Sequence, residues 1–155
     1  MSSQQQNAPP AIVSQPELAL LVFTLLERYH QVAQCFKVLR EDRAAMEKFE
    51  TGTIAPEERE NTRAMATGLF NHLFVLVQRR LLAPQDFATV VPPRGARLWL
   101  DLVAPLDFAV RQAVAGEAAI PLGETAVEIF YRHYADDGNV MLIVGSASQV
   151  DPTVQ

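Results

Sequence analysis

The stretch SQPELALLVFTLLERYHQVAQCFKVLR, residues 14–40, decides the fold. Its apolar residues recur at alternating steps of four and three, which places them on one face of an α-helix. The beginning of this helix is also encoded, because Ser14 and Glu17 have the spacing of a capping box and Pro16 fits the first turn. We therefore expect a helix from Ser14 to about Arg40. Its apolar seam comprises Leu18, Val22, Leu25, Tyr29, Val32, Phe36 and Leu39.

The rest of the chain predicts further helices separated by proline and glycine. Pro105 removes a backbone N–H inside one of them, so this helix should kink or split at Ala104. The predicted fold class is all-α: an irregular helical bundle of about four to five helices, followed by a short C-terminal strand or an extended segment. The further expected helices cover 41–50, 56–82, 95–115 and a last segment that follows Gly123-Glu124 and ends at about Tyr134. A short helical turn is expected over 84–90, and the expected strand covers 140–144.

Length and composition favour a single soluble domain. A chain of 155 residues is long enough to bury a substantial core. Its 49% apolar and 20% charged residues are typical of a globular protein rather than a disordered one. We expect a disordered leader over residues 1–13, a helical domain over 14–138, and a C-terminal extended segment and tail over 139–155.

Charge and cysteine content exclude several classes of protein. A net charge of −5 argues against general nucleic-acid binding, which depends on Lys and Arg neutralising phosphates. Cys35 is the only cysteine, so the chain has no internal disulfide and suits a reducing compartment. The longest apolar run is shorter than the roughly twenty residues of a membrane-spanning helix, and the N-terminus has no signal-peptide pattern. These features predict a cytoplasmic protein without a membrane span.

Residues Phe70–Gln112 resemble part of a family of uncharacterised bacterial helical proteins. In that family a helix ends in a Val-x-Arg-Gly-Leu-Leu turn, which is followed by an acidic-aromatic helix start and a tryptophan-bearing helix. Arg80 stands where the family usually has glycine. The resemblance implies a helical fold and carries no active site; relatives often have a membrane span ahead of the domain, which we do not expect here. The matching residues are Phe70-Asn71-His72-Leu73-Phe74, Leu76 to Leu82, Phe87, Leu98-Trp99 and Pro105-Leu106.

The residues most often used in catalysis do not form a recognisable constellation. Glu27 and His30 have the i, i+3 spacing of di-metal helical bundles, but no second Glu-x-x-His motif accompanies them. Cys35 has no base nearby in the sequence and is best interpreted as a core residue. The glycines are isolated, so no phosphate-binding loop is present. We expect no catalytic site, no metal and no cofactor.

One group of surface candidates combines arginines with an aromatic residue. The arginines lie near the end of one predicted helix and the beginning of another, so a tight connection would bring them together. Arginine beside an exposed aromatic is a common anchor for a protein interface or an anionic ligand. Alternatively, the arginines stabilise helix ends and the tryptophan belongs to the core. The candidates are Arg79, Arg80, Arg94, Arg97 and Trp99.

A second group of candidates is apolar. The half-helix Leu18–Leu26 is apolar nearly all round, and residues 140–144 form another apolar run. Surplus apolar surface of this kind favours association with a second subunit. The candidate residues for self-association are Leu18, Leu21, Val22, Leu25, Val140, Leu142 and Val144.

These signals support three functional hypotheses. The first is a non-enzymatic helical interaction or regulatory protein whose partner is another protein, a second copy of itself as in a homodimer, or both. The second is a ligand-binding or enzymatic helical domain with a pocket that uses His72 or His133 and nearby carboxylates. The third is an inhibitor of a host protein encoded by a phage or mobile element, which would suit a small acidic helical protein.

Overall fold

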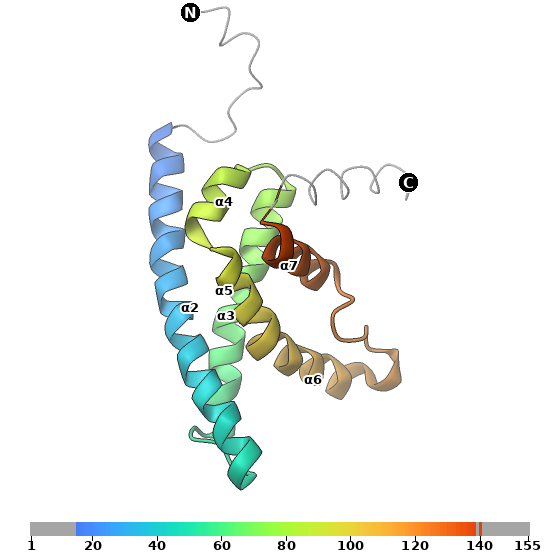
Figure 1. Cartoon of the computed structure of the whole chain (residues 1–155). Coiled ribbons are helices and arrows are strands. Elements are labelled where there is room, and N and C mark those ends of the chain that lie inside the picture. Colours follow the sequence, from blue (N-terminus) through green and yellow to red (C-terminus); the bar gives the residue numbers. More distant parts are fainter. Residues whose placement is uncertain (1–14, 139, 141–155) are drawn as a thin grey trace, which may run out of the picture.

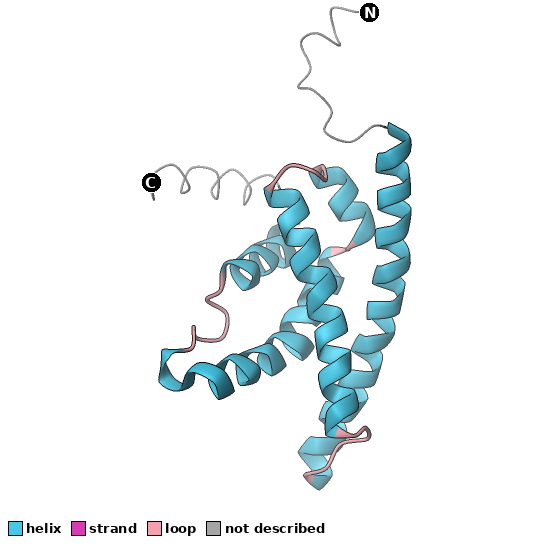
Figure 2. Ribbon diagram, turned by 180° about the vertical axis from the view of Figure 1, so that it is seen from behind, coloured by secondary structure: helices cyan, strands magenta, loops and turns pink. Residues whose placement is uncertain are grey.

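The computed structural model describes residues 15–138 and 140, and the regular structure in this part is helical throughout (Figure 2). The all-α prediction is confirmed. Two long antiparallel helices run side by side along the molecule, and shorter helices cover one side of this pair (Figure 1). The elements are α2 (Gln15–Phe49), α3 (Pro56–Gln78), α4 (Pro84–Val90), α5 (Pro93–Leu98), the π-helix η1 (Trp99–Val103), α6 (Ala104–Ala115), the 3₁₀ turn η2 (Gly116–Ala118) and α7 (Ala126–Asp137).

Helix α2 is longer than its sequence predicts. We expected a break near Arg40 and a separate helix over 41–50, but α2 continues without interruption to Phe49. No Pro or Gly lies at the expected break, and the buried stripe continues past it to Asp42. The predicted seam is confirmed, since its members are buried or pack against the core. The predicted cap Ser14 lies outside the described residues.

Helix α3 ends in a turn that places Arg80 in the left-handed conformation. The amide of Leu81 donates to the carbonyl of Leu76 at 2.8 Å, and the amide of Arg80 donates to that of Val77 at 3.0 Å. This is the Schellman pattern, in which the residue after the cap adopts a left-handed conformation. Arg80 has φ 61°, a region where glycine is favoured because a Cβ is strained there.

The core is centred on aromatic rings from α3, α4, η1 and α7. Phe70 stacks on Trp99 at 5.4 Å between centroids with the rings 6° apart, and it also contacts Tyr131 at 4.9 Å. The hydroxyl of Tyr131 donates to the carbonyl of Phe70, and that of Tyr134 donates to the carbonyl of Val91, each at 2.5 Å. Both tyrosine hydroxyls are thus buried with a partner, as burial of a polar group requires.

Pro105 acts as predicted, because the helical segment divides at Ala104. The preceding turn is wound as a π-helix from Trp99 to Val103. Pro105 has no N–H to offer the carbonyl of Asp101, and Arg43 of α2 donates to this carbonyl instead at 2.9 Å. A long-range contact therefore compensates for the local loss of a helical hydrogen bond.

The connection between α2 and α3 is organised by one buried carboxylate. Asp42 accepts hydrogen bonds from the amides of Thr53 and Ile54 at 2.8 and 3.3 Å. Arg59 of α3 donates to both oxygens of Asp42, at 2.6 and 3.2 Å. Gly52 passes so close that a Cβ there would overlap the carboxylate. Asp42 thereby ties the loop and both long helices together.

We predict that Asp42→Asn lowers the free energy of unfolding by about 2 kcal/mol, because the partly buried Arg59 and two backbone amides lose their charged acceptor. The hydrogen bonds from Arg59 lower the pKa of Asp42. A carboxyl with a lowered folded-state pKa stabilises the fold above its unfolded pKa, near 4, and loses this contribution as the pH falls through the folded value. The difference between wild type and variant in urea titrations should therefore shrink below about pH 4.

The matched control is Glu47→Gln, on the same helix. Glu47 pairs with Arg43 at 3.5 Å, and both side chains are exposed. Exposed pairs contribute little to stability, so this variant should unfold almost as wild type does at every pH. Equal losses in the two variants would contradict the structural role of Asp42.

We also predict that Arg80→Gly is more stable than Arg80→Ala by about 1 kcal/mol. Both substitutions remove the same side chain, so the comparison isolates the cost of a Cβ at positive φ. Chemical denaturation of the two variants measures the difference. Equal stability would mean that position 80 does not hold the left-handed conformation in solution.

Candidate functional site

The N-terminal half of α2 presents two large apolar side chains to solvent. Leu20 is 66% exposed and Phe23 is 59% exposed. We define these two residues as the α2 face. The positions named from the sequence lie elsewhere on the helix: Leu25 is fully buried, and Leu18, Leu21 and Val22 pack partly against the core. The sequence could have distinguished the exposed residues from the packed ones, because positions 20 and 23 lie off the apolar seam formed by positions 18, 22 and 25.

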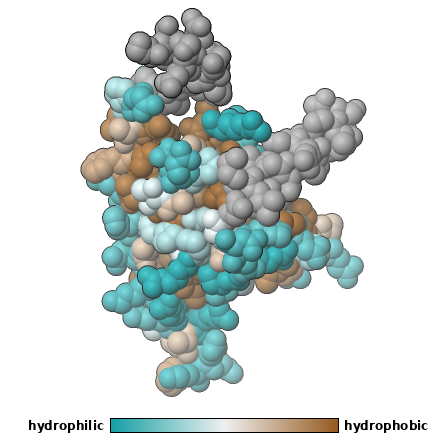
Figure 3. All heavy atoms as spheres, turned by 45° about the horizontal axis from the view of Figure 1, so that its top comes forward, coloured by the Kyte–Doolittle hydropathy of each residue, from teal (hydrophilic) through white to brown (hydrophobic). Residues whose placement is uncertain are grey.

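A shallow cavity of about 390 Å³ adjoins the α2 face. It lies where α2 passes α4, and Figure 3 shows apolar surface gathered near the beginning of α2. Phe23 belongs to both features, so the exposed face and the cavity form one continuous apolar area. The cavity is lined by Gln15, Leu18, Ala19, Val22, Phe23, Leu26 and Asp86.

The second apolar run, residues 140–144, was expected to form a strand and to offer surface for self-association. Val140 is 4% exposed, lies in a helical conformation and packs into the core cluster. It is therefore not a surface residue in this chain, and no strand occurs in the part of the chain that the structure describes. Leu142 and Val144 lie outside the described residues.

The arginine and tryptophan candidates do not form a common site. Trp99 is buried at 2% exposure and stacked on Phe70, so it is a core residue. Arg97 pairs with Asp136 of α7 at 2.5 Å, whereas Arg79 caps the end of α3. Arg94 is exposed on α5. Trp99 therefore lies in the core, and Arg79 and Arg97 lie at helix ends, as the alternative interpretation of these residues predicts.

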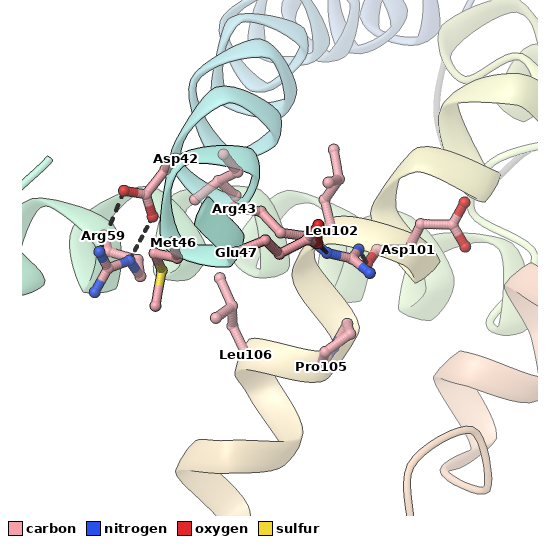
Figure 4. A pocket seen from close by; sticks show the side chains of 10 residues that line it. Asp42, Arg43, Met46, Glu47, Arg59, Asp101, Leu102, Pro105 and Leu106 are labelled. Carbon is pink, nitrogen blue, oxygen red and sulfur yellow. Dashed lines mark hydrogen bonds and ion pairs between the residues drawn. The ribbon is translucent and has the colours of Figure 1, made fainter. Parts of the chain in front are cut away.

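A cavity of about 390 Å³ lies between the C-terminal part of α2 and the junction of η1 with α6 (Figure 4). Its walls are apolar, with Leu39, Met46, Leu102, Pro105 and Leu106, and Arg43, Glu47 and Asp101 add charge. Asp42 and Arg59 face each other at one side of it (Figure 4). Oδ1 of Asp42 accepts from the loop amides and from Arg59, and Oδ2 accepts from Arg59, so both oxygens already hold the α2–α3 connection together.

The histidines lie at the surface. Arg28 donates to Nδ1 of His72 at 2.9 Å, which requires a neutral ring with its proton on Nε2. Partial burial, and secondly Arg28, lowers the pKa of His72. His30 and His133 are exposed, and none of the cavities described here is lined by a histidine.

Cys35 is not an activated nucleophile. The residue is buried, its Sγ lies 3.7 Å from Sδ of Met65, and burial raises the pKa of its thiol. A raised pKa keeps the sulfur protonated at neutral pH, whereas nucleophilic cysteines require the thiolate. Among residues 15–138 and 140, no three His, Cys, Asp or Glu side chains are grouped to hold a metal ion.

A polar cavity of about 310 Å³ lies between α3, η1, α6 and α7. On one side Asp107 accepts hydrogen bonds from Arg63 and Thr67, each at 2.5 Å. Burial outweighs these bonds and raises the pKa of Asp107. On the other side Glu128 forms a capping box with Thr125 at the beginning of α7.

Nothing in the sequence predicted this cavity as a whole, although one part of it has a local signal. Thr125 and Glu128 have the Thr-x-x-Glu spacing of a capping box, so the start of α7 could have been recognised. The approach of Asp107 to Arg63, 44 positions earlier, has no local signal in the sequence.

No helix in the described part of the chain is both long enough and apolar enough to cross a membrane. Comparison with protein-family models, with curated protein sequences and with solved structures finds no match to this chain.

Proposed function

We propose that this chain is a non-enzymatic helical interaction protein that associates with a second copy of itself through the α2 face. The observation that carries the proposal is the exposure of Leu20 and Phe23 next to an apolar cavity. Contiguous apolar surface of this kind marks interaction sites on soluble proteins. Phe23 supplies the large aromatic anchor that interfaces favour at their centre.

The charge pattern of α2 favours a second copy as the occupant. A two-fold axis brings each residue near its own equivalent, so a charged residue close to the axis would meet a like charge. The segment from Leu18 to Leu26 contains no charged residue; Glu17 and Glu27 flank it in the sequence, and Asp86 of α4 lines the adjoining cavity. An uncharged stretch of this length allows two identical helices to approach without repulsion.

The size of the α2 face determines the expected strength of association. A stable interface buries roughly 800 Å² on each partner, which is more than the exposed side of a few helical turns provides. We therefore expect a dimer that dissociates at concentrations on the order of micromolar and whose population depends on dilution.

We predict that Phe23→Glu converts the dimer into a monomer. The substitution removes the aromatic anchor and places two like charges near the two-fold axis. Phe23 is mostly exposed, so the monomer should keep its fold and thermal unfolding midpoint. Sedimentation velocity across a concentration series, with circular dichroism as the check on folding, measures both effects.

Val114→Glu is the matched control, because Val114 is an apolar residue of α6 that is 85% exposed and lies off α2. This variant adds the same charge and should dimerise like wild type. A wild-type chain that stays monomeric throughout the concentration series would refute self-association. Equal dissociation of both variants would refute the assignment to the α2 face.

A further inference from the structure

We infer that a groove between α6 and the junction of α2 with α3 binds a basic amphipathic helix of a partner protein. The groove consists of two adjoining cavities of about 390 and 250 Å³, which share Leu106 and Arg59. We call it the α6 groove. It is separate from the α2 face, because the part of α2 that lines it, from Leu39 to Glu47, lies in the other half of this helix.

The first observation is that α6 carries apolar surface which the rest of the described chain does not cover. Only Ala104 and Asp107 are buried among its 12 residues. Figures 1 and 2 show the reason, since α6 runs away from α2 and α3 after η1. An apolar helix face without an internal partner is typical of an interaction surface. The residues that α6 presents to the groove follow the i, i+3, i+4, i+7 pattern of one helix face: Leu106, Ala109, Val110 and Ala113.

The apolar surface continues into the larger cavity, where α2 provides the facing wall. Leu39 and Leu102 are buried there, whereas Met46 is 40% exposed. Figure 4 shows Met46 of α2 and Leu106 of α6 pointing into the space between their helices. Residues 102–113 span roughly 16 Å, which equals about three turns of a docked helix. This length suits a helix that inserts apolar anchors at i, i+3 or i+4, and i+7.

The arginines of the α6 groove are not available to an anionic partner. Arg63 lies 2.5 Å from both Glu60 and Asp107, so one cation already faces two anions. The other two guanidinium groups each face one carboxylate. These pairs are Arg43 with Glu47 at 3.5 Å and Arg59 with Asp42 at 2.6 Å.

The charges around the α6 groove favour a basic partner. Asp101 also lines it, and its carboxylate has no hydrogen bond or ion pair within the described part of the chain, so five carboxylates meet three guanidinium groups. Glu57 and Glu58 add exposed negative charge in the first turn of α3. The nearby cations Arg40 and Lys48 line neither cavity. Lys and Arg of a partner would therefore meet complementary charge, whereas Asp and Glu would be repelled.

A second copy of this chain does not supply such a helix. The chain carries a net charge of −5, and the apolar first half of α2, from Leu18 to Leu26, contains no Lys or Arg. Docked in the α6 groove, this segment would leave the excess of carboxylates without counter-charges. The groove is therefore assigned to a different protein.

The experiment uses two fluorescein-labelled peptides of about 14 residues, long enough to fill the groove as a helix. Both have Leu along one helix face, and their polar faces carry Lys in one peptide and Glu in the other. We expect the Lys peptide to bind the wild-type chain saturably in fluorescence anisotropy, with a Kd on the order of 10 µM at low salt. The Glu peptide should bind at least about tenfold more weakly, as should a scrambled Lys peptide without an apolar face. Equal affinity for the Lys peptide and either of the others, or no saturable binding of the Lys peptide, would overturn the inference.

Met46→Lys and Val110→Lys place a repelling charge at the two ends of the α6 groove. These side chains are 40% and 38% exposed, so both variants should fold, with circular dichroism as the check. Each should weaken the Lys peptide at least about tenfold. Met65→Lys is the matched control, because Met65 of α3 is 51% exposed and lines neither cavity. Wild-type affinity in Met46→Lys or Val110→Lys, or an equal loss in the control, would overturn the assignment to the groove.

Two further measurements separate the α6 groove from self-association. Phe23→Glu should bind the Lys peptide with wild-type affinity, since its substitution lies in the other half of α2. A loss of affinity in this variant would place the peptide on the α2 face and overturn the inference. Sedimentation velocity of Met46→Lys should give the wild-type oligomeric state. A dimer that is lost in Met46→Lys and kept in Phe23→Glu would assign the groove to a second copy instead.

Discussion

The stacking of Phe70 on Trp99 lies at the point where α3, η1, α2 and α7 meet. Phe70 lies in the second half of α3, and its ring also contacts Phe36 of α2 at 6.0 Å and Tyr131 of α7 at 4.9 Å. A single side chain thus joins both long helices to η1 and to the last helix. Aromatic pairs contribute both buried area and orientation, so this contact also sets how η1 lies on α3.

The same packing decides which residues are available for function. Because Trp99 is drawn into the core, it cannot act with the surface arginines, and its indole nitrogen faces the interior instead. Tyr131 holds α7 against α3 through its hydrogen bond to Phe70, which brings Glu128 to the wall of the cavity between α3, η1, α6 and α7.

The exposure of the α2 face also follows from how the core is packed. Core contacts occupy one side of α2, and the all-round apolar character of its first half leaves Leu20 and Phe23 exposed on the other.

Irregular backbone in this protein is compensated by contacts from distant residues. Arg43 of α2 donates to the carbonyl of Asp101, to which Pro105 cannot donate. Asp42 accepts hydrogen bonds from the amides of the α2–α3 connection. The π-helix begins at Trp99, between the core and the polar cavity. The irregular segment therefore lies at the boundary between the aromatic core and this cavity.

Local patterns determined the helical class, the seam of α2, the short helix α4 and the division at Pro105, because each depends on residues within a few turns of one another. The same patterns did not predict that α2 continues past Arg40. No Pro or Gly lies near this position, so local sequence gave no signal for or against a break, and tertiary contacts decided the length of the helix. Only the tertiary structure decided that Trp99 is buried and that Arg63 meets Asp107. It also decided which side of the first half of α2 stays in solvent. These outcomes depend on contacts between residues far apart in the chain, for which neighbouring sequence carries no periodic signal.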